Sequence, residues 1–125
     1  MFTTRMRASG FKETLRQAPL GYEINMGTPL GHFVMPEGET RRHVFIAGGI
    51  GITPYRSILR CAVDTKKPID AVMLYFSHSA ADIVFGQELE DIARQMTTFS
   101  LVHVLSEPEP SWKGEKGRLN EALLR

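Results

Sequence analysis

Apolar and polar positions change their spacing most clearly between residues 43 and 62, which read HVFIAGGIGITPYRSILRCA. The unbroken apolar run from Val44 to Ala47 predicts a strand that is buried on both faces. Glycines follow, and apolar residues then recur every three or four positions, which is typical of an amphipathic helix. Thr53 is expected to cap this helix, with Pro54 in its first turn. The segment therefore predicts a strand, a tight turn and a helix in direct succession.

Two further apolar segments extend this pattern. Residues 71–77 and 99–105 each predict a strand, and the residues between them predict a helix capped by Asp82. Residues 107–117 are rich in proline, glycine and charge and predict a surface loop, and a short helix is expected to begin near Leu119. Strands that alternate with helices indicate an α/β fold, a parallel sheet with helices on its faces. Right-handed crossovers predict the doubly wound strand order 3-2-1.

The first forty residues follow a different pattern. Residues 2–7 show partial alternation, and residues 22–26 alternate apolar with polar side chains, so each predicts a strand. A short helix is expected over residues 11–17. We interpret this region as antiparallel β structure. The sequence therefore predicts two parts, residues 1–40 and an α/β domain over residues 41–125.

The charge and cysteine content narrow the classes of partner. The 125 residues carry 15 Lys and Arg against 14 Asp and Glu, a net charge of +1. This balance gives no basic field of the kind that nucleic acid or an anionic membrane surface would require, so small molecules or proteins are the expected partners. Cys61 is the only cysteine, and neither a membrane span nor a signal peptide is apparent. A cytoplasmic protein is the expectation.

The turn after the first predicted strand suits an anionic ligand. Gly48, Gly49 and Gly51 allow positive φ and leave no Cβ in the way of a ligand that approaches the main chain. The N-terminus of the following helix adds unpaired N–H groups and the positive end of the helix dipole, which favour phosphate. A tight connection that binds no ligand is the alternative interpretation.

Two common phosphate-binding loops are excluded by their residues. A P-loop ends in a lysine followed by serine or threonine, and no lysine lies between Lys12 and Lys66. The dinucleotide fingerprint GxGxxG would begin at Gly49, but Pro54 occupies the position of its third glycine. The four histidines show no metal-ligand spacing, so no metal site is predicted.

The glycine-rich residues 48–54, GGIGITP, resemble the GGxGxTP loop that receives the nicotinamide nucleotide in the ferredoxin-NADP reductase family of flavin enzymes. Four other segments resemble motifs of that family in the same order: SGFKETL at residues 9–15, GTPLGHF at residues 27–33, Ser77 with the pair Glu88 and Leu89, and the WxGxxGR pattern from Trp112 to Arg118.

The resemblance implies that the chain corresponds to the middle of such an enzyme, truncated at both ends. Residues 1–40 would be the remnant of an FAD-binding β-barrel, and residues 41–125 an NAD(P)-binding domain without its C-terminal part. The implied activity is hydride transfer from NAD(P)H to FAD, with electrons passed on to an acceptor such as an electron-carrier protein. Because the cofactors carry this chemistry, no catalytic side chain is predicted. The implied cofactor-binding residues are Gly48, Gly49, Ile50, Gly51, Ile52, Thr53, Pro54, Ser77 and His78 for the nucleotide, and Ser9, Gly10, Phe11 and Lys12 for FAD.

The residues after the second predicted strand bear on the choice of nucleotide. A ribose 2′-phosphate is usually bound by arginine or lysine, and a free 2′-hydroxyl by an acidic group. Ser77, His78 and Ser79 supply neither. The missing cation favours NADH over NADPH.

Two further interpretations follow. A non-catalytic nucleotide-binding or protein-interaction module derived from the same family is the alternative function.

The predicted strand at residues 43–47 would also have an open edge, with no lysine or proline from Val44 to Ala47 to prevent pairing with another chain. A homo-oligomer that pairs through this edge is therefore expected.

Overall fold

The computed structural model describes residues 3–28, 30–36 and 38–121, and the chain divides into two compact units, Met1–Phe33 and Val34–Arg125. The first unit contains helix α1 (Gly10–Gln17), close to the predicted range. The strands predicted at residues 2–7 and 22–26 are wrong for the residues that the structure describes. Tyr22 and Met26 are 59% and 71% exposed. Alternation alone makes no strand, because a strand needs neighbours to pair its backbone groups and cover its apolar side.

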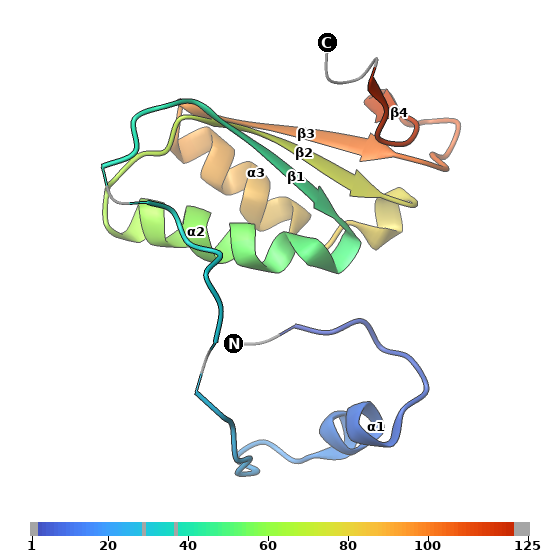
Figure 1. Cartoon of the computed structure of the whole chain (residues 1–125). Helices are drawn as coiled ribbons and strands as arrows, with labels where there is room; N and C mark the ends of the chain where they lie inside the picture. Colours follow the sequence, from blue (N-terminus) through green and yellow to red (C-terminus); the bar gives the residue numbers. More distant parts are fainter. Residues whose placement is uncertain (1–2, 29, 37, 122–125) are drawn as a thin grey trace. The chain divides into compact units, whose positions relative to one another are not determined.

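The second unit contains a parallel sheet and two α-helices (Figure 1). Its strands occur in the order β1-β2-β3-β4. The elements are β1 (His43–Gly48), α2 (Thr53–Asp64), β2 (Ala71–Ser77), α3 (Gly86–Gln95), β3 (Phe99–Leu105) and β4 (Glu115–Lys116), with 3₁₀ turns at Gly49–Ile52 and Ala80–Asp82.

The α/β class and the parallel pairing are confirmed, and β2 and β3 have the predicted bounds. The predicted surface loop contains the short strand β4, which pairs with Val104 and Leu105. Leu119 and Asn120, near which a helix is expected to begin, are not helical, and the rest of that prediction falls on residues 122–125, which lie outside the described residues. No helix in the described part of the chain has the length and apolar character needed to cross a membrane.

Both α-helices of this unit lie on the same face of the sheet (Figure 1). Alternate strand residues point toward them, so Phe45, Met73 and Tyr75 are buried against Leu59 and Leu89. This layer of apolar contacts is the core of the unit, and it holds the carboxyl ends of the strands in place.

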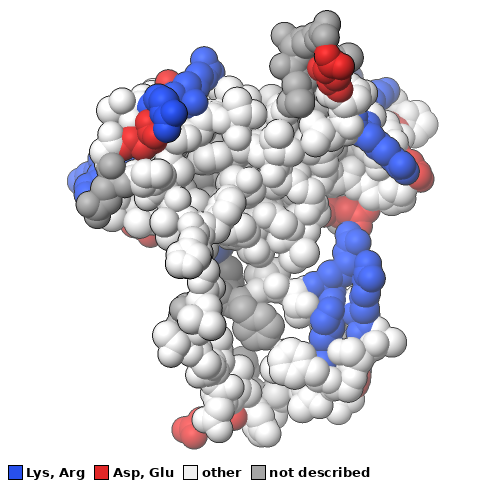
Figure 2. Space-filling model, in the orientation of Figure 1, with Lys and Arg blue, Asp and Glu red and all other residues white. Residues whose placement is uncertain are grey.

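The opposite face of β1 differs from the prediction. The apolar run predicted burial on both faces, but Val44 is 62% exposed and Ile46 is 37% exposed. No second helical layer covers this face in the described part of the chain, and β1 lies at the edge of the sheet. In the view of Figure 2, charged side chains of this unit gather toward its margins, and the surface between them is largely uncharged.

Helix α3 begins later than predicted. Asp82 does not cap it; its carboxylate accepts hydrogen bonds from the Ser79 backbone N–H at 3.2 Å and the Ser79 hydroxyl at 2.8 Å, and so closes the preceding 3₁₀ turn. Phe85 is the residue before α3, with a left-handed φ of 59°. Leu89 and Ile92 of this helix are fully buried, so its apolar face packs into the core.

Candidate nucleotide-binding site

The sheet brings two predicted groups of site residues together. Parallel strands end at the same edge of a sheet, and the register pairs Gly48 at the end of β1 with Phe76 in β2. The glycine-rich loop, residues 48–54, therefore lies beside Ser77 and His78. Ligands of open α/β sheets bind at this carboxyl edge.

Residues 49–52 of the glycine-rich loop form a single 3₁₀ turn between β1 and α2. Only Gly49 uses a left-handed φ, at 49°. A Cβ added at Gly48 or Gly51 would meet no atom within 4 Å, so these two glycines border open space. Ile52, fully buried, anchors the end of the turn in the core. The loop is thus anchored in the core through Ile52 and is open to a ligand beside Gly48 and Gly51.

The first residues of α2 carry no side-chain cap, contrary to the expectation for Thr53. The 3₁₀ turn runs directly into the helix with Ile52 already helical, so no extended residue precedes it as an N-cap requires. The Thr53 hydroxyl instead donates to the carbonyl oxygen of Ile50 at 3.2 Å. The Thr53 backbone N–H also donates to the carbonyl oxygen of Ile50, and Pro54 has no N–H, so the main-chain donors for an anionic ligand would come from the glycine-rich turn that precedes α2.

Ser77 and His78 follow this loop across the sheet edge. Ser77 is 7% exposed, and its hydroxyl has no hydrogen-bond partner among the described residues. An unpaired buried hydroxyl is uncommon and calls for a water or ligand. His78 is exposed, with Nδ1 3.3 Å from the Ser106 hydroxyl and Nε2 3.4 Å from the Glu107 carboxylate.

Glu107 was missed by sequence analysis. It lies in the segment that follows β3, and its backbone N–H donates to the carbonyl oxygen of His78 at 2.8 Å. The signal was present in the parallel pattern, because the residues after two adjacent parallel strands meet at one edge. The structure therefore adds a carboxylate to the residues that follow β2.

The FAD residues predicted from the resemblance lie in the first unit. Ser9 caps α1, and its hydroxyl accepts from the backbone N–H of Lys12 at 3.2 Å. The Lys12 ammonium donates to the carbonyl oxygen of Arg5 at 2.5 Å. Gly10 begins α1, and Phe11 is 69% exposed.

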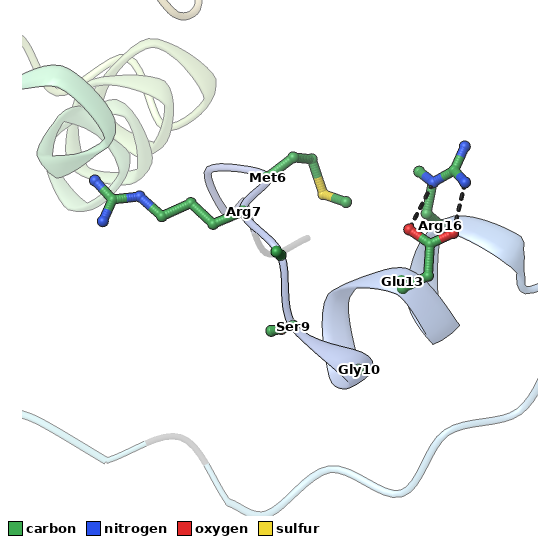
Figure 3. Close-up of a pocket in the computed structure, with 7 residues that line it drawn as sticks. Met6, Arg7, Ser9, Gly10, Glu13 and Arg16 are labelled. Carbon is green, nitrogen blue, oxygen red and sulfur yellow. Dashed lines mark hydrogen bonds and ion pairs between the residues drawn. The ribbon is translucent and has the colours of Figure 1, made fainter.

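A hollow of about 690 Å³ lies beside this segment, lined by residues 6–10 together with Glu13 and Arg16. Figure 3 shows Arg7 extending away from α1, whereas Arg16 turns toward Glu13. Two hydrogen bonds of 2.5 Å and 3.0 Å join these two side chains. The positive charge of Arg16 is thus already paired.

No group of three or more His, Cys, Asp and Glu residues in the described part of the chain could hold a metal ion. His103 lies on the helix-facing side of β3, its ring centroid 5.7 Å from that of Tyr75. Neither ring nitrogen has a hydrogen-bond partner among the described residues, and the Glu90 carboxylate lies 4.0 Å from Nε2. Burial lowers the pKa of His103 below its ordinary value of 6.5, and Glu90 offsets part of this change.

Because burial lowers the pKa of His103, we expect the folded chain to be less stable in acid than at neutral pH. Between pH 6.5 and the lower folded-state pKa, the unfolded chain binds a proton at this residue that the folded chain does not, so the free energy of unfolding decreases as the pH falls through this range and levels off below the folded-state pKa. Urea unfolding at a series of pH values should show a smaller acid loss in His103→Leu than in the wild type. His32→Leu, at an exposed position, is the control and should lose as much stability in acid as the wild type. The same loss of stability in His103→Leu as in the wild type would contradict the prediction.

Comparisons with known proteins agree with this geometry. Residues 45–125 match the family described as the oxidoreductase NAD-binding domain. The chain is 32% identical to the nitrate reductase [NADPH] of Fusarium oxysporum, over 98% of its own length and 15% of the relative's. It is 30% identical to ferredoxin–NADP reductase B of Sorangium cellulosum, over 91% and 47% of the two lengths. The cytochrome b5 reductase domain of Ulva prolifera nitrate reductase has a similar fold, with a TM-score of 0.78 at 24% identity over 90% and 47% of the two chains.

The chain therefore belongs to the oxidoreductase NAD-binding domain family, and the resemblance to the ferredoxin-NADP reductase family is confirmed. It spans less than half the length of each of these three proteins.

Proposed function

We propose that this chain is the NAD(P)H-binding portion of a flavin-dependent reductase. In this proposal hydride passes from NAD(P)H to FAD, and electrons pass on to an acceptor such as an electron-carrier protein. Residues 48–54, with Ser77 and His78, bind the nicotinamide nucleotide. Ser9, Gly10, Phe11 and Lys12 contact FAD, and residues 1–40 derive from a flavin-binding β-barrel. Residues 41–125 form the nucleotide domain with the strand order 3-2-1 of a doubly wound sheet, of which the described residues provide the helices of one face (Figure 1).

The observation that carries the proposal is the start of α2. The helix begins behind a glycine-rich turn with no capping side chain, and Gly48 and Gly51 border open space. A pyrophosphate placed there would receive backbone hydrogen bonds and the favourable end of the helix dipole. The orphaned hydroxyl of Ser77 lies on the adjacent strand. The protein supplies binding and orientation, while the cofactors supply the redox chemistry.

The function is tested by titrating the purified chain with NADH and then adding FAD and NADH without oxygen. Nucleotide binding together with bleaching of the flavin absorbance, faster than in protein-free controls, supports the reductase. Binding without bleaching supports the alternative, a non-catalytic nucleotide-binding or protein-interaction module. This alternative is worth testing directly because the described part of residues 1–33, which the reductase proposal derives from a flavin-binding β-barrel, contains no strand. Absence of NADH and NADPH binding would contradict the reductase and the nucleotide-binding module, and would leave only the protein-interaction module.

We also propose a preference for NADH. The Glu107 carboxylate lies 3.4 Å from His78 Nε2, beside the residues that follow β2. A carboxylate at this position repels a ribose 2′-phosphate and can accept a hydrogen bond from a free 2′-hydroxyl. Glu107 therefore supplies the acidic group for the ribose 2′-hydroxyl, which Ser77, His78 and Ser79 do not provide.

Glu107→Lys is expected to shift the ratio of NADPH to NADH affinity toward NADPH by roughly tenfold, about 1.4 kcal/mol. The substitution replaces a repulsive charge with an attractive one at an exposed position. Calorimetric titration with both nucleotides measures the ratio. Glu109→Lys is the control, since it makes the same charge change two residues farther along. An equal shift in both variants would indicate a general charge effect and contradict the assignment.

Two other parts of the proposal concern assembly and location. We propose that the chain forms a homo-oligomer through the edge of β1, which pairs only with β2 among the described residues. We propose a cytoplasmic location, a reducing compartment compatible with the unpaired Cys61.

A further inference from the structure

The buried side chain of Tyr75 joins two loops at the proposed nucleotide site. Tyr75 lies in β2 and is fully buried on the helix-facing side of the sheet. Its hydroxyl donates a hydrogen bond to the carbonyl oxygen of Gly49 at 3.1 Å. It also accepts one from the backbone N–H of Val84 at 3.1 Å. Since a phenolic hydroxyl has one proton to donate, that proton is used by the glycine-rich loop, and the oxygen is used by the loop between β2 and α3.

Both loops turn through left-handed backbone next to these hydrogen bonds. Gly49 itself has a φ of 49°, and Phe85, which follows Val84, has a φ of 59°. The left-handed conformation is uncommon for a bulky side chain such as phenylalanine and persists only where its surroundings hold it. Gly49 adopts this conformation without strain, whereas Phe85 does not, so the Tyr75 hydroxyl joins the turn of the first loop to the residue next to the strained position of the second.

Arg56 makes a second link between the same two parts of the chain. It lies in α2, just after the glycine-rich loop, and its guanidinium makes two hydrogen bonds to the Glu88 carboxylate of α3, at 2.7 Å and 2.8 Å. The guanidinium carbon also lies 4.6 Å from the centroid of the Phe85 ring. Phe85 is thus held through its side chain by Arg56, while its neighbour Val84 is held through its backbone by Tyr75.

We propose that Tyr75 is a positioning residue that keeps the glycine-rich loop and the loop after β2 at a fixed separation, so that a nicotinamide nucleotide meets a preformed site. The inference rests on the proposed function, in which the glycine-rich loop binds the pyrophosphate and the residues after β2 bind the adenosine ribose. A ligand that spans both loops gains from their fixed separation. A ligand that uses only the second loop gains less.

The test compares Tyr75→Phe with the wild type in the full chain, using NADH and adenosine as probes, since adenosine has the ribose but no phosphate for the glycine-rich loop. Phenylalanine keeps the buried ring and removes only the hydroxyl. We expect the NADH dissociation constant to rise about tenfold and that of adenosine to change less than twofold. Amide hydrogen exchange should become faster at residues 49–52 and 83–85 and stay unchanged in β3. Ile92→Val is the matched control: it removes one buried methyl group from α3, lowers stability, and leaves both Tyr75 hydrogen bonds in place.

Four results would overturn the inference. An NADH dissociation constant in Tyr75→Phe equal to that of the wild type would show that the hydroxyl does not position the site. Equal losses of NADH and adenosine affinity with faster exchange throughout the unit, or the same NADH loss in Ile92→Val, would show an effect of stability alone. A wild-type chain that binds no nicotinamide nucleotide would contradict the proposed function and the inference together, and is recognised before any variant is made.

Discussion

Gly51→Val is expected to weaken NADH binding by at least about tenfold, or about 1.4 kcal/mol, while the chain still folds. A Cβ at this position meets no protein atom within 4 Å, and Gly51 does not have a left-handed φ. The fold therefore accommodates a side chain. The new methyl groups would instead occupy the open side of the loop, where the proposed pyrophosphate must approach the main chain.

Two variants make this test specific. Gly51→Ala should give a smaller loss than valine, because it adds one carbon at the same place. Thr97→Val is the control. Thr97 is exposed in the turn between α3 and β3, at the amino end of β3 and so at the opposite edge of the sheet from the proposed site, and the variant should bind NADH as tightly as the wild type. Affinities are measured by calorimetry and stabilities by urea unfolding. Wild-type affinity in Gly51→Val would show that the nucleotide does not approach this loop.

The strands and their parallel pairing could be predicted because their patterns are local and strong. Residues 71–77 and 99–105 are apolar runs bounded by polar or turn-forming residues, and both form strands over the predicted ranges. Strand-helix-strand succession also limits the topologies that a short chain can adopt. The carboxyl edge of the sheet, and with it the neighbourhood of Gly48 and Ser77, follows from that topology alone.

The start of α3 and the roles of the two expected cap residues could not be predicted because they depend on backbone geometry that composition does not specify. Thr53 and Asp82 both have side chains suited to an N-cap, yet Thr53 is already the first residue of α2 and Asp82 closes a 3₁₀ turn. Helix α3 begins after Phe85, whose left-handed backbone has no sequence signal of the kind that glycine provides. Its position becomes understandable only with the Arg56 contact and the Val84 hydrogen bond in view.

Contacts between distant segments were also missed. Glu107 reaches His78 because β2 and β3 are adjacent, and Arg56 reaches Glu88 because α2 and α3 lie on the same face of the sheet. Each depends on the packed arrangement of two elements, which single-sequence periodicity does not describe. The alternation at Tyr22 and Ile24 failed for the opposite reason, since a local pattern is present but the described residues of this unit contain no strand to pair with it.

The largest expected effect on assembly is dissociation of the proposed homo-oligomer by Val44→Lys. Val44 and Ile46 are exposed on β1, at the edge of the sheet, where unpaired backbone groups can accept another strand. Pairing of β1 with the same strand of a second chain would satisfy these groups and bring the two exposed faces into one continuous apolar surface. In a two-fold pair each chain contributes one lysine, so the substitution introduces two like charges close to the new interface.

Ser100 provides a matched control for this test. The register aligns Val44 with Val72 and Val72 with Ser100, so Val44 and Ser100 lie in one row on the same face, on opposite sides of β2. Light scattering coupled to gel filtration, over a range of protein concentrations, should show the wild type and Ser100→Lys with the mass of more than one chain. Val44→Lys should be monomeric, with a dissociation constant raised at least about tenfold. A monomeric wild type at every concentration would contradict the assembly. Dissociation by Ser100→Lys to the same extent would contradict the β1 edge, because it would indicate stacking of the apolar faces, whose contacts both substitutions disturb alike.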